Sequence, residues 1–384
     1  MRLNALTCAT VLATVSVVAA TEGFNPREYA KLKKHTTCKA VKRDEGDKPV
    51  DINMSYVDIN PSAKHTLLLV HGWPSLWTTW SYQIKEFEND YRLIAPDHRG
   101  FGESTHPGDV QSSGTLQDLV ADMVCVLEDA GVTTATCVGH DWGSAVCYEA
   151  ARSRPDIFTA VAGVAVPYMP ANGDHFTPVA ALVPLLPKLA YNVFFADNTT
   201  AAAAELNEDV GRTIRATLRQ KSSPPPEDFL TYKDTYMGPW KKYAEIPPVP
   251  FFTPEEEKYY IEQYSIQKFD NTLQFYTTPA SPPNKLGHNR YSAWKFAHDQ
   301  GNWTIPQPAL SILPSDDPVA DWVKAAAILH SADFLPNLKT VVVPGSHWFH
   351  LESAAPFNKE LRAWLEETLS EKAETVTEHI VDEF

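Results

Sequence analysis

Short apolar runs alternate with longer amphipathic runs along most of the chain. The short runs have the length of buried strands and occupy residues 50–60, 65–70, 92–95, 132–138, 158–166, 309–313 and 339–343. The longer runs have helical patterns and occupy residues 77–87, 115–131, 145–152 and 360–369. Because strands that alternate with helices pair in parallel, the pattern predicts an α/β fold, with a mostly parallel central sheet flanked by helices.

One long section in the middle of the chain lacks this alternation. Its two helical patterns, at 201–219 and 255–264, have no strand between them, and prolines cluster around 224–254. The second pattern follows Thr253, a good N-cap, and has Pro254 at its first helical position. We therefore expect a helical cap inserted into the sheet domain. The predicted divisions are a signal peptide (1–20), a first core section (21–166), the cap (167–300), a second core section (301–369) and an acidic tail (370–384).

The N-terminus is typical of a secretory signal peptide. An apolar run from Ala5 to Ala20 is too short for a membrane span, and it ends in Val-Ala-Ala, which resembles a signal-peptidase site. Three Asn-x-Ser/Thr sequons, at Asn53, Asn198 and Asn302, are candidate glycosylation sites. We therefore expect a secreted glycoprotein without a membrane span in the mature chain.

Composition narrows the classes of partner. The chain has 384 residues, is 43% hydrophobic and carries a net charge of −15. With no basic cluster, it is not expected to bind nucleic acid, and no cofactor or metal is expected. Four cysteines remain beyond the signal: Cys38, Cys125, Cys137 and Cys147. The last three lie in predicted core elements, so buried free thiols are expected. The oligomeric state is left open.

A nucleophile elbow is predicted around Asp141. An apolar run leads into Gly-His-Asp-Trp-Gly-Ser at residues 139–144, and a helical run follows. Gly139 and Gly143 flank the central residues because a sharp strand-to-helix turn needs close backbone approach. Aspartate also caps helices, but the strand before it and the two glycines favour a nucleophile. A carboxylate is ionised at neutral pH, so it suits attack on a saturated carbon with a leaving group or strained ring. An aspartate at the elbow excludes a serine esterase.

An ester formed on Asp141 needs a base, an orienting acid and an oxyanion hole for its hydrolysis. His347 lies just after a predicted strand and after Asp141 in chain order, as the base of such a triad should. Asp316 and Asp317 follow the preceding strand, and either carboxylate could orient the histidine. His347 is therefore the candidate base, and the choice between the two acids stays open on chemistry alone.

Two backbone N–H groups are candidates for the oxyanion hole. One belongs to Trp142, the residue after the nucleophile. The other belongs to Trp73, in the turn His71-Gly72-Trp73-Pro74 that follows a predicted strand. The histidines of this turn and of the turn at His98 are interpreted as structural.

Four motifs resemble those of the epoxide hydrolases with the α/β-hydrolase fold, of the soluble, fungal and secreted type. The motifs lie at residues 71–74, 99–104, 139–144 and 345–348, and the similarity runs from about residue 40 to 368. The resemblance implies the α/β-hydrolase fold, Asp317 as the orienting acid, and a cis peptide bond before Pro74.

The resemblance also assigns two tyrosines of the cap, Tyr191 and Tyr276, to the epoxide oxygen. A phenol with a pKa near 10 can hydrogen-bond an alkoxide leaving group and deliver a proton to it. The implied reaction converts an apolar epoxide and water into a vicinal diol. The family often has arginine where Thr277 stands, and the loop 277–291 is unusual. These two departures affect the expected shape of the pocket and not the expected chemistry.

Two other functions are compatible with these motifs. A haloalkane dehalogenase uses the same Asp and His chemistry, and it could bind halide through Trp142 and Trp73. The two tyrosines favour the epoxide, because an alkoxide needs a proton donor and a halide does not. A non-catalytic binding protein of the same fold is the remoter alternative. Such a protein would be expected to lack His347 or its acid, and this chain has candidates for both.

Overall fold

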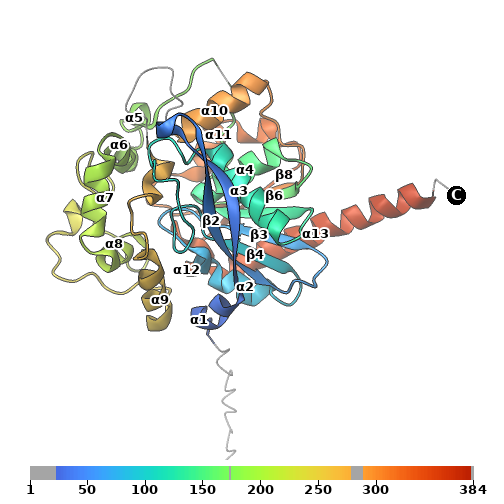
Figure 1. Ribbon diagram of the computed structural model, residues 1–384, viewed down its shortest axis with the longest axis horizontal. Helices are drawn as coiled ribbons and strands as arrows, with labels where there is room; N and C mark the ends of the chain where they lie inside the picture. The colour runs from blue at the N-terminus through green and yellow to red at the C-terminus, as the bar shows by residue number, and fades with distance from the viewer. Residues whose placement is uncertain (1–22, 173, 278–288, 382–384) are drawn as a thin grey trace, which may run out of the picture.

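An eight-stranded sheet forms the centre of the protein. The computed structural model describes residues 23–172, 174–277 and 289–381 (Figure 1). Across the sheet the strands are β1 (Lys33–Lys42), β2 (Lys48–Ile59), β4 (Arg92–Pro96), β3 (Thr66–Val70), β5 (Ala135–His140), β6 (Phe158–Val164), β7 (Ala309–Pro314) and β8 (Leu338–Val343). The pairs β1–β2 and β2–β4 are antiparallel and the others are parallel, so the predicted mostly parallel sheet is confirmed.

Apolar runs become strands where both faces of the sheet are covered. Every residue of β3 and of β5 is buried, as expected for parallel strands between two helical layers. The edge strand β1 was not predicted, because its sequence Lys-Lys-His-Thr-Thr-Cys-Lys-Ala-Val-Lys is mostly polar. It forms instead through a ten-residue antiparallel register with β2.

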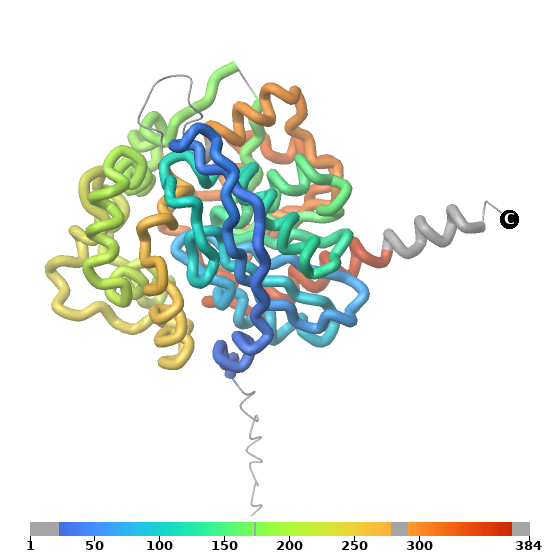
Figure 2. Tube along the Cα trace, viewed as in Figure 1, coloured from blue at the N-terminus to red at the C-terminus, as the bar shows by residue number. Residues whose placement is uncertain are grey.

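The helices fall into two groups. Those of the core are α1 (Pro26–Tyr29), α2 (Ser81–Phe87), α3 (Leu116–Asp129), α4 (Trp142–Ser153), α10 (Asn289–Gln300), α11 (Trp322–Ile328), α12 (Phe349–Glu352) and α13 (Ala354–Val381). Those between β6 and α10 are α5 (Val179–Leu182), α6 (Ala190–Asp197), α7 (Thr199–Asn207), α8 (Val210–Thr217) and α9 (Pro254–Tyr264). Figures 1 and 2 show this second group together on one side of the sheet. The exact limits of the cap stay a prediction, and α10, inside the predicted range, packs against α3.

Two predicted helices differ in extent. The pattern at 201–219 forms two helices, because α7 ends at Asn207 and Asp209 caps α8 by accepting a hydrogen bond from the Arg212 N–H at 2.8 Å. The last helix begins at Ala354 and runs on to Val381, beyond the predicted end. The α9 prediction is confirmed, with Thr253 and Glu256 forming a capping box. Within the described residues, no helix is both long and apolar enough to cross a membrane.

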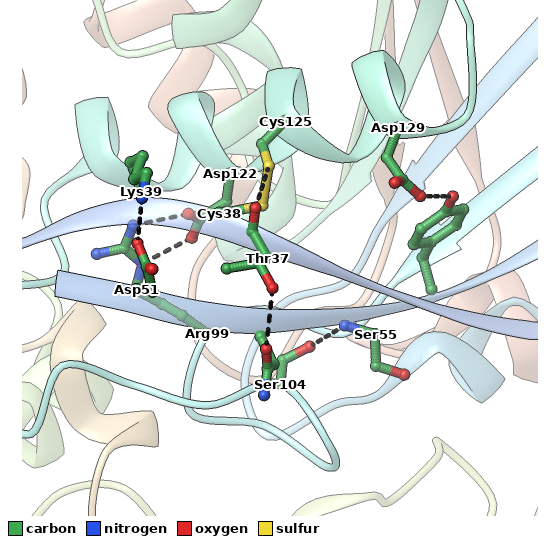
Figure 3. Close-up of a disulfide and its surroundings, with 12 residues drawn as sticks. Thr37, Cys38, Lys39, Asp51, Ser55, Arg99, Ser104, Asp122, Cys125 and Asp129 are labelled. Carbon is green, nitrogen blue, oxygen red and sulfur yellow. Dashed lines mark hydrogen bonds and ion pairs between the residues drawn. A yellow bond between two sulfur atoms is a disulfide. The ribbon is translucent and has the colours of Figure 1, made fainter.

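The four cysteines form two disulfides, so the expectation of free thiols was wrong. Cys38 of β1 is bonded to Cys125 of α3, with Cα atoms 6.0 Å apart (Figure 3). Cys137 of β5 is bonded to Cys147 of α4, with Cα atoms 5.4 Å apart. Sequence separations of 87 and 10 residues correspond to about 4.6 and about 2.7 kcal/mol of loop-closure stabilisation. A cysteine in the core can be a free thiol or part of a disulfide, so the position of these cysteines in buried elements did not distinguish the two.

Candidate active site

Asp141 lies at the corner between β5 and α4, as predicted. Its backbone has φ 56° and ψ −120°, a conformation that is rare for a residue with a side chain. A Cβ added to Gly139 would lie 2.0 Å from the carbonyl oxygen of Gly143, and one added to Gly143 would lie 2.1 Å from that of Val70. Both positions therefore require glycine for the close approach that the turn makes, and the side chain of Asp141 is presented at the carboxyl edge of the sheet.

The structure brings His347 and Asp317 to Asp141. The Nε2 atom of His347 is 3.5 Å from Oδ2 of Asp141, and its Nδ1 atom is 2.7 Å from Oδ2 of Asp317. The side chain of Asp317 is fully buried and is fixed by hydrogen bonds from the Val319 N–H and the Trp322 indole. Each ring nitrogen of His347 thus faces a different carboxylate.

Asp316 takes no part in this arrangement. Its side chain is 41% exposed, accepts a hydrogen bond from Ser315, and forms an ion pair with Lys221 at 2.9 Å. The geometry therefore selects Asp317, in agreement with the family resemblance.

The charges of the three groups are coupled. Burial lowers the pKa of His347, but the negative charges of Asp317 and Asp141 outweigh this effect and raise that pKa to about 10. Burial likewise raises the pKa of Asp141, but the hydrogen bond and positive charge of His347 hold it below its usual value. The resting site therefore contains an ionised Asp141 beside a protonated His347.

One predicted oxyanion donor already contacts the nucleophile. The N–H of Trp73 donates to Oδ1 of Asp141 at 2.9 Å, and the Trp73–Pro74 peptide bond is cis, as the resemblance implied. A Cβ at Gly72 would lie 2.5 Å from the same Oδ1, so glycine lets the turn come this close. Trp142 is the first residue of α4, and its N–H therefore belongs to the helical turn whose donors have no partner within the helix. Its oxyanion role stays a prediction.

The two assigned tyrosines lie together beside the elbow. Tyr191 belongs to α6, Tyr276 follows the short helix η6 (Thr272–Phe275), and their ring centroids are 5.7 Å apart. The Tyr276 ring is also 5.4 Å from the rings of Trp73 and Trp142. Burial raises the pKa of both phenols, and the negative charge of Asp141 raises each further. Both tyrosines are therefore neutral hydrogen-bond donors near the nucleophile.

The Trp73 indole is already engaged. Its Nε1–H donates to the hydroxyl of Thr272 at 3.1 Å, so this group is used to join the core to the cap. Thr277, where the family often has arginine, donates its hydroxyl to the carbonyl of Val110 at 2.9 Å. Most of the unusual loop, residues 278–288, lies outside the described residues.

Two buried histidines near the site were not predicted to have a role. His140 Nε2 is 2.9 Å from the carbonyl oxygen of His347, and the ring of His140 is 4.2 Å from that of His350. Burial lowers the pKa of His140 to about 4, so the ring is neutral and can donate to that carbonyl. The one feature of the sequence that could have indicated this role is the position of His140 directly before Asp141. His71 and His98, by contrast, are structural as expected, since the His98 N–H donates to His71 Nε2 at 3.0 Å.

Comparison with known proteins places this geometry in a family. A family model described as alpha/beta hydrolase fold matches residues 65–354. Bifunctional epoxide hydrolase 2 of Sus scrofa is 27% identical over 332 residues, which cover 83% of this chain and 56% of that protein. The chain thus spans about half the length of that relative. Epoxide hydrolase A of Mycobacterium tuberculosis is 26% identical over 309 residues, covering 78% of this chain and 90% of that protein.

Solved structures show the same fold. An epoxide hydrolase from an endophytic Streptomyces has a TM-score of 0.67 at 25% identity, covering 88% of this chain and 96% of the other. Epoxide Hydrolase A from Mycobacterium thermoresistibile has a TM-score of 0.69 at 24% identity, covering 87% and 98% respectively. The family match extends over most of the sheet and the whole elbow-to-histidine arrangement, and the chain belongs to the α/β-hydrolase fold family.

Proposed function

We propose that the protein is an epoxide hydrolase that converts an apolar epoxide and water into a vicinal diol through an ester on Asp141. The observation that carries this proposal is a largely buried, ionised aspartate at the elbow, with a His347–Asp317 pair beside it and two neutral tyrosines nearby. The relatives and solved structures described above, which are named epoxide hydrolases, support it.

In the first step the carboxylate of Asp141 attacks a ring carbon of the epoxide. A carbon–oxygen bond of the ring breaks as the ester bond forms, and the epoxide oxygen becomes an alkoxide that takes a proton from Tyr191 or Tyr276. The tyrosine takes a proton back from solvent, and His347 gives its own proton up to solvent. The step therefore moves one proton in total, from the imidazolium to the new hydroxyl. The negative charge of Asp141 is consumed in this step.

The loss of that charge prepares the second step. With Asp141 esterified, one of the two carboxylates that raise the pKa of His347 is neutral, so this pKa falls and the imidazole becomes a base. Neutral His347 takes a proton from water, and the hydroxide attacks the ester carbonyl. The N–H groups of Trp73 and Trp142 stabilise the oxyanion. When the intermediate collapses, its hydroxyl proton passes to the leaving alcohol, which gives the diol and restores the carboxylate.

A single turnover in ¹⁸O-labelled water tests the covalent route. The water oxygen enters the ester carbonyl, so label is expected in the side chain of Asp141 and not in the first diol formed. Peptide mass spectrometry locates the label in the protein. Label found directly in the diol would show that water attacks the epoxide without an ester.

The tyrosines separate this function from haloalkane dehalogenation. In the double variant Tyr191→Phe/Tyr276→Phe, hydrolysis of styrene oxide should fall by about 10²-fold or more, because no phenol protonates the alkoxide. Tyr236→Phe is the matched control, since its buried hydroxyl is paired with Thr217 at 3.0 Å and its ring is 5.9 Å from that of Tyr191. If the wild-type protein hydrolyses 1-bromobutane and the double variant hydrolyses the epoxide as fast as wild type, the dehalogenase would be favoured. The Trp73 indole, which donates to Thr272, counts against a halide site at that position.

The surroundings of the nucleophile support an apolar substrate. The buried ring of Phe195 is 5.1 Å from the rings of Trp73 and Tyr276, and the ring of Trp142 stacks on Phe275 at 5.3 Å. An aromatic wall of this kind binds hydrocarbon substituents and leaves few polar groups to recognise charged ones.

We also propose that the protein is of the soluble, fungal and secreted type and is glycosylated. The apolar N-terminal run supports this, although residues 1–22 lie outside the described part. The pairing of four cysteines in disulfides is usual for an oxidising compartment, and Asn53, Asn198 and Asn302 are all exposed. N-terminal sequencing of secreted protein and its mass before and after glycosidase treatment test the proposal. An uncleaved N-terminus and an unchanged mass would contradict it.

A further inference from the structure

One disulfide spans the nucleophile elbow. Cys137 lies in β5, which leads into Asp141, and Cys147 lies in α4, which leads away from it. The bridge closes a loop whose ends are only 10 residues apart in sequence, and Asp141 lies inside this loop. Both cysteines are fully buried, so the bridge joins the sheet to the helix within the core and not at the surface.

The corner that this loop contains depends on close approach of β5 and α4. Asp141 has a positive φ, a conformation that persists in a residue with a side chain only when the surrounding structure imposes it. The approach is so close that a Cβ on Gly139 would lie 2.0 Å from the carbonyl oxygen of Gly143. Hydrogen bonds from the Asp141 N–H to Val164 and from the Ser144 N–H to the Asp141 carbonyl, both 3.0 Å, hold the corner on its other sides. The disulfide is the covalent member of this set of restraints.

We propose that Cys137 and Cys147 are positioning residues, whose disulfide holds the Asp141 carboxylate in the geometry required for attack on substrate. The inference rests on the function proposed above. If β5 and α4 separate slightly, the carboxylate moves relative to the Trp73 N–H at 2.9 Å and to His347 at 3.5 Å. Nucleophilic attack is sensitive to displacements of about 1 Å, whereas binding of the rest of the substrate is not.

The chain contains a matched control. The Cys38–Cys125 disulfide joins the edge strand β1 to α3 (Figure 3), and neither cysteine belongs to β5, to α4 or to the turn between them. Its longer loop, with a separation of 87 residues against 10, makes it the larger contributor to the free energy of unfolding in the loop-closure model. Loss of Cys38–Cys125 is therefore expected to lower stability more, and loss of Cys137–Cys147 is expected to lower activity more.

The experiment compares Cys137→Ala/Cys147→Ala with Cys38→Ala/Cys125→Ala and with wild type. Single-turnover measurements on styrene oxide should show the rate constant of ring opening falling about tenfold or more in the first variant, with the substrate dissociation constant unchanged within about twofold. The second variant should keep both values within about twofold of wild type, although its unfolding midpoint in urea falls further. Equal slowing in both variants would overturn the proposal, and so would wild-type ring opening in the first.

A third variant separates the tether from the volume that the sulfurs fill. Cys137→Ala/Cys147→Val returns apolar volume without the bond, so it should open the ring as slowly as the double alanine variant. Recovery of the wild-type rate would assign the effect to packing and overturn the proposal. Mass spectrometry of the denatured, unreduced wild type after thiol alkylation should show no label on Cys137 or Cys147; label there would also overturn it.

Amide hydrogen exchange gives a readout that does not need turnover. Exchange in peptides covering residues 139–147 should be faster in Cys137→Ala/Cys147→Ala than in wild type and unchanged in Cys38→Ala/Cys125→Ala. If wild type opens no epoxide, the proposed function fails, but this difference would still support the restraint on the elbow. Unchanged exchange in the first variant would refute it.

Discussion

Replacing Asp317 by asparagine removes the negative charge that faces Nδ1 of His347 while leaving the shape of the side chain almost unchanged. The carboxylate of Asp317 lies 2.7 Å from Nδ1, belongs to a fully buried side chain, and accepts two further hydrogen bonds, from Val319 and Trp322. The substitution therefore tests the charge and the orientation of the imidazole, with little effect expected on packing.

The size of the effect follows from the pKa of His347. A rise in the pKa of His347 from the usual histidine value of about 6.5 to about 10 corresponds to about 5 kcal/mol in favour of the imidazolium. Two carboxylates produce this shift against the opposing effect of burial, and only Asp317 still carries its charge once Asp141 is esterified. Without it, the imidazolium that forms during ester hydrolysis is buried without a counter-ion. An asparagine amide can also donate to Nδ1, which places the proton on Nε2 and leaves no lone pair facing water.

Ester hydrolysis in Asp317→Asn is therefore expected to slow by about 10³- to 10⁴-fold, while ring opening by Asp141 continues. Intact-protein mass spectrometry after rapid quenching should show the enzyme accumulating with one substrate mass added. Asp316→Asn is the control, because that side chain is exposed and pairs with Lys221. Normal turnover in Asp317→Asn, or accumulation of the ester in Asp316→Asn, would refute the assignment.

Two further predictions concern the pH dependence and the elbow. The rate constant of ring opening should be constant between about pH 5 and 9, since His347 holds the pKa of Asp141 low. The rate constant of ester hydrolysis should rise with pH, because this step needs neutral His347. Stopped-flow measurement of the two phases checks both, and hydrolysis that slows as pH rises would contradict the assignment. Gly139→Ala should lower the free energy of unfolding in urea by about 3 kcal/mol or more, because its Cβ would lie 2.0 Å from the Gly143 carbonyl oxygen. Gly23→Ala, where a Cβ meets nothing within 4 Å, should change it by less than about 0.5 kcal/mol, and equal losses would show that the elbow contact is not the cause.

The regular core was predictable because its signals are local. An apolar run such as 132–138, followed by glycine, aspartate and glycine, indicates a strand, a sharp turn and a helix within one stretch of chain. The helix after Thr253 was likewise indicated by its own capping residues. The polar strand β1 was not predicted because its own sequence has no apolar pattern, and its pairing with β2 and its disulfide to α3 both depend on residues distant in the chain.

The sequence by itself indicated the candidate nucleophile, the candidate base and the positions of most strands along the chain, because these depend on neighbours in the chain. Only the tertiary structure decided that His347 faces Asp317 rather than Asp316, and that Cys137 is bonded to Cys147. It also decided that two tyrosines of the cap lie beside Asp141. These relations join segments distant in the chain or turn on differences of a few ångströms. Distances of that kind are set by how the sheet, the helices and the cap pack together, and no residue's local sequence contains them.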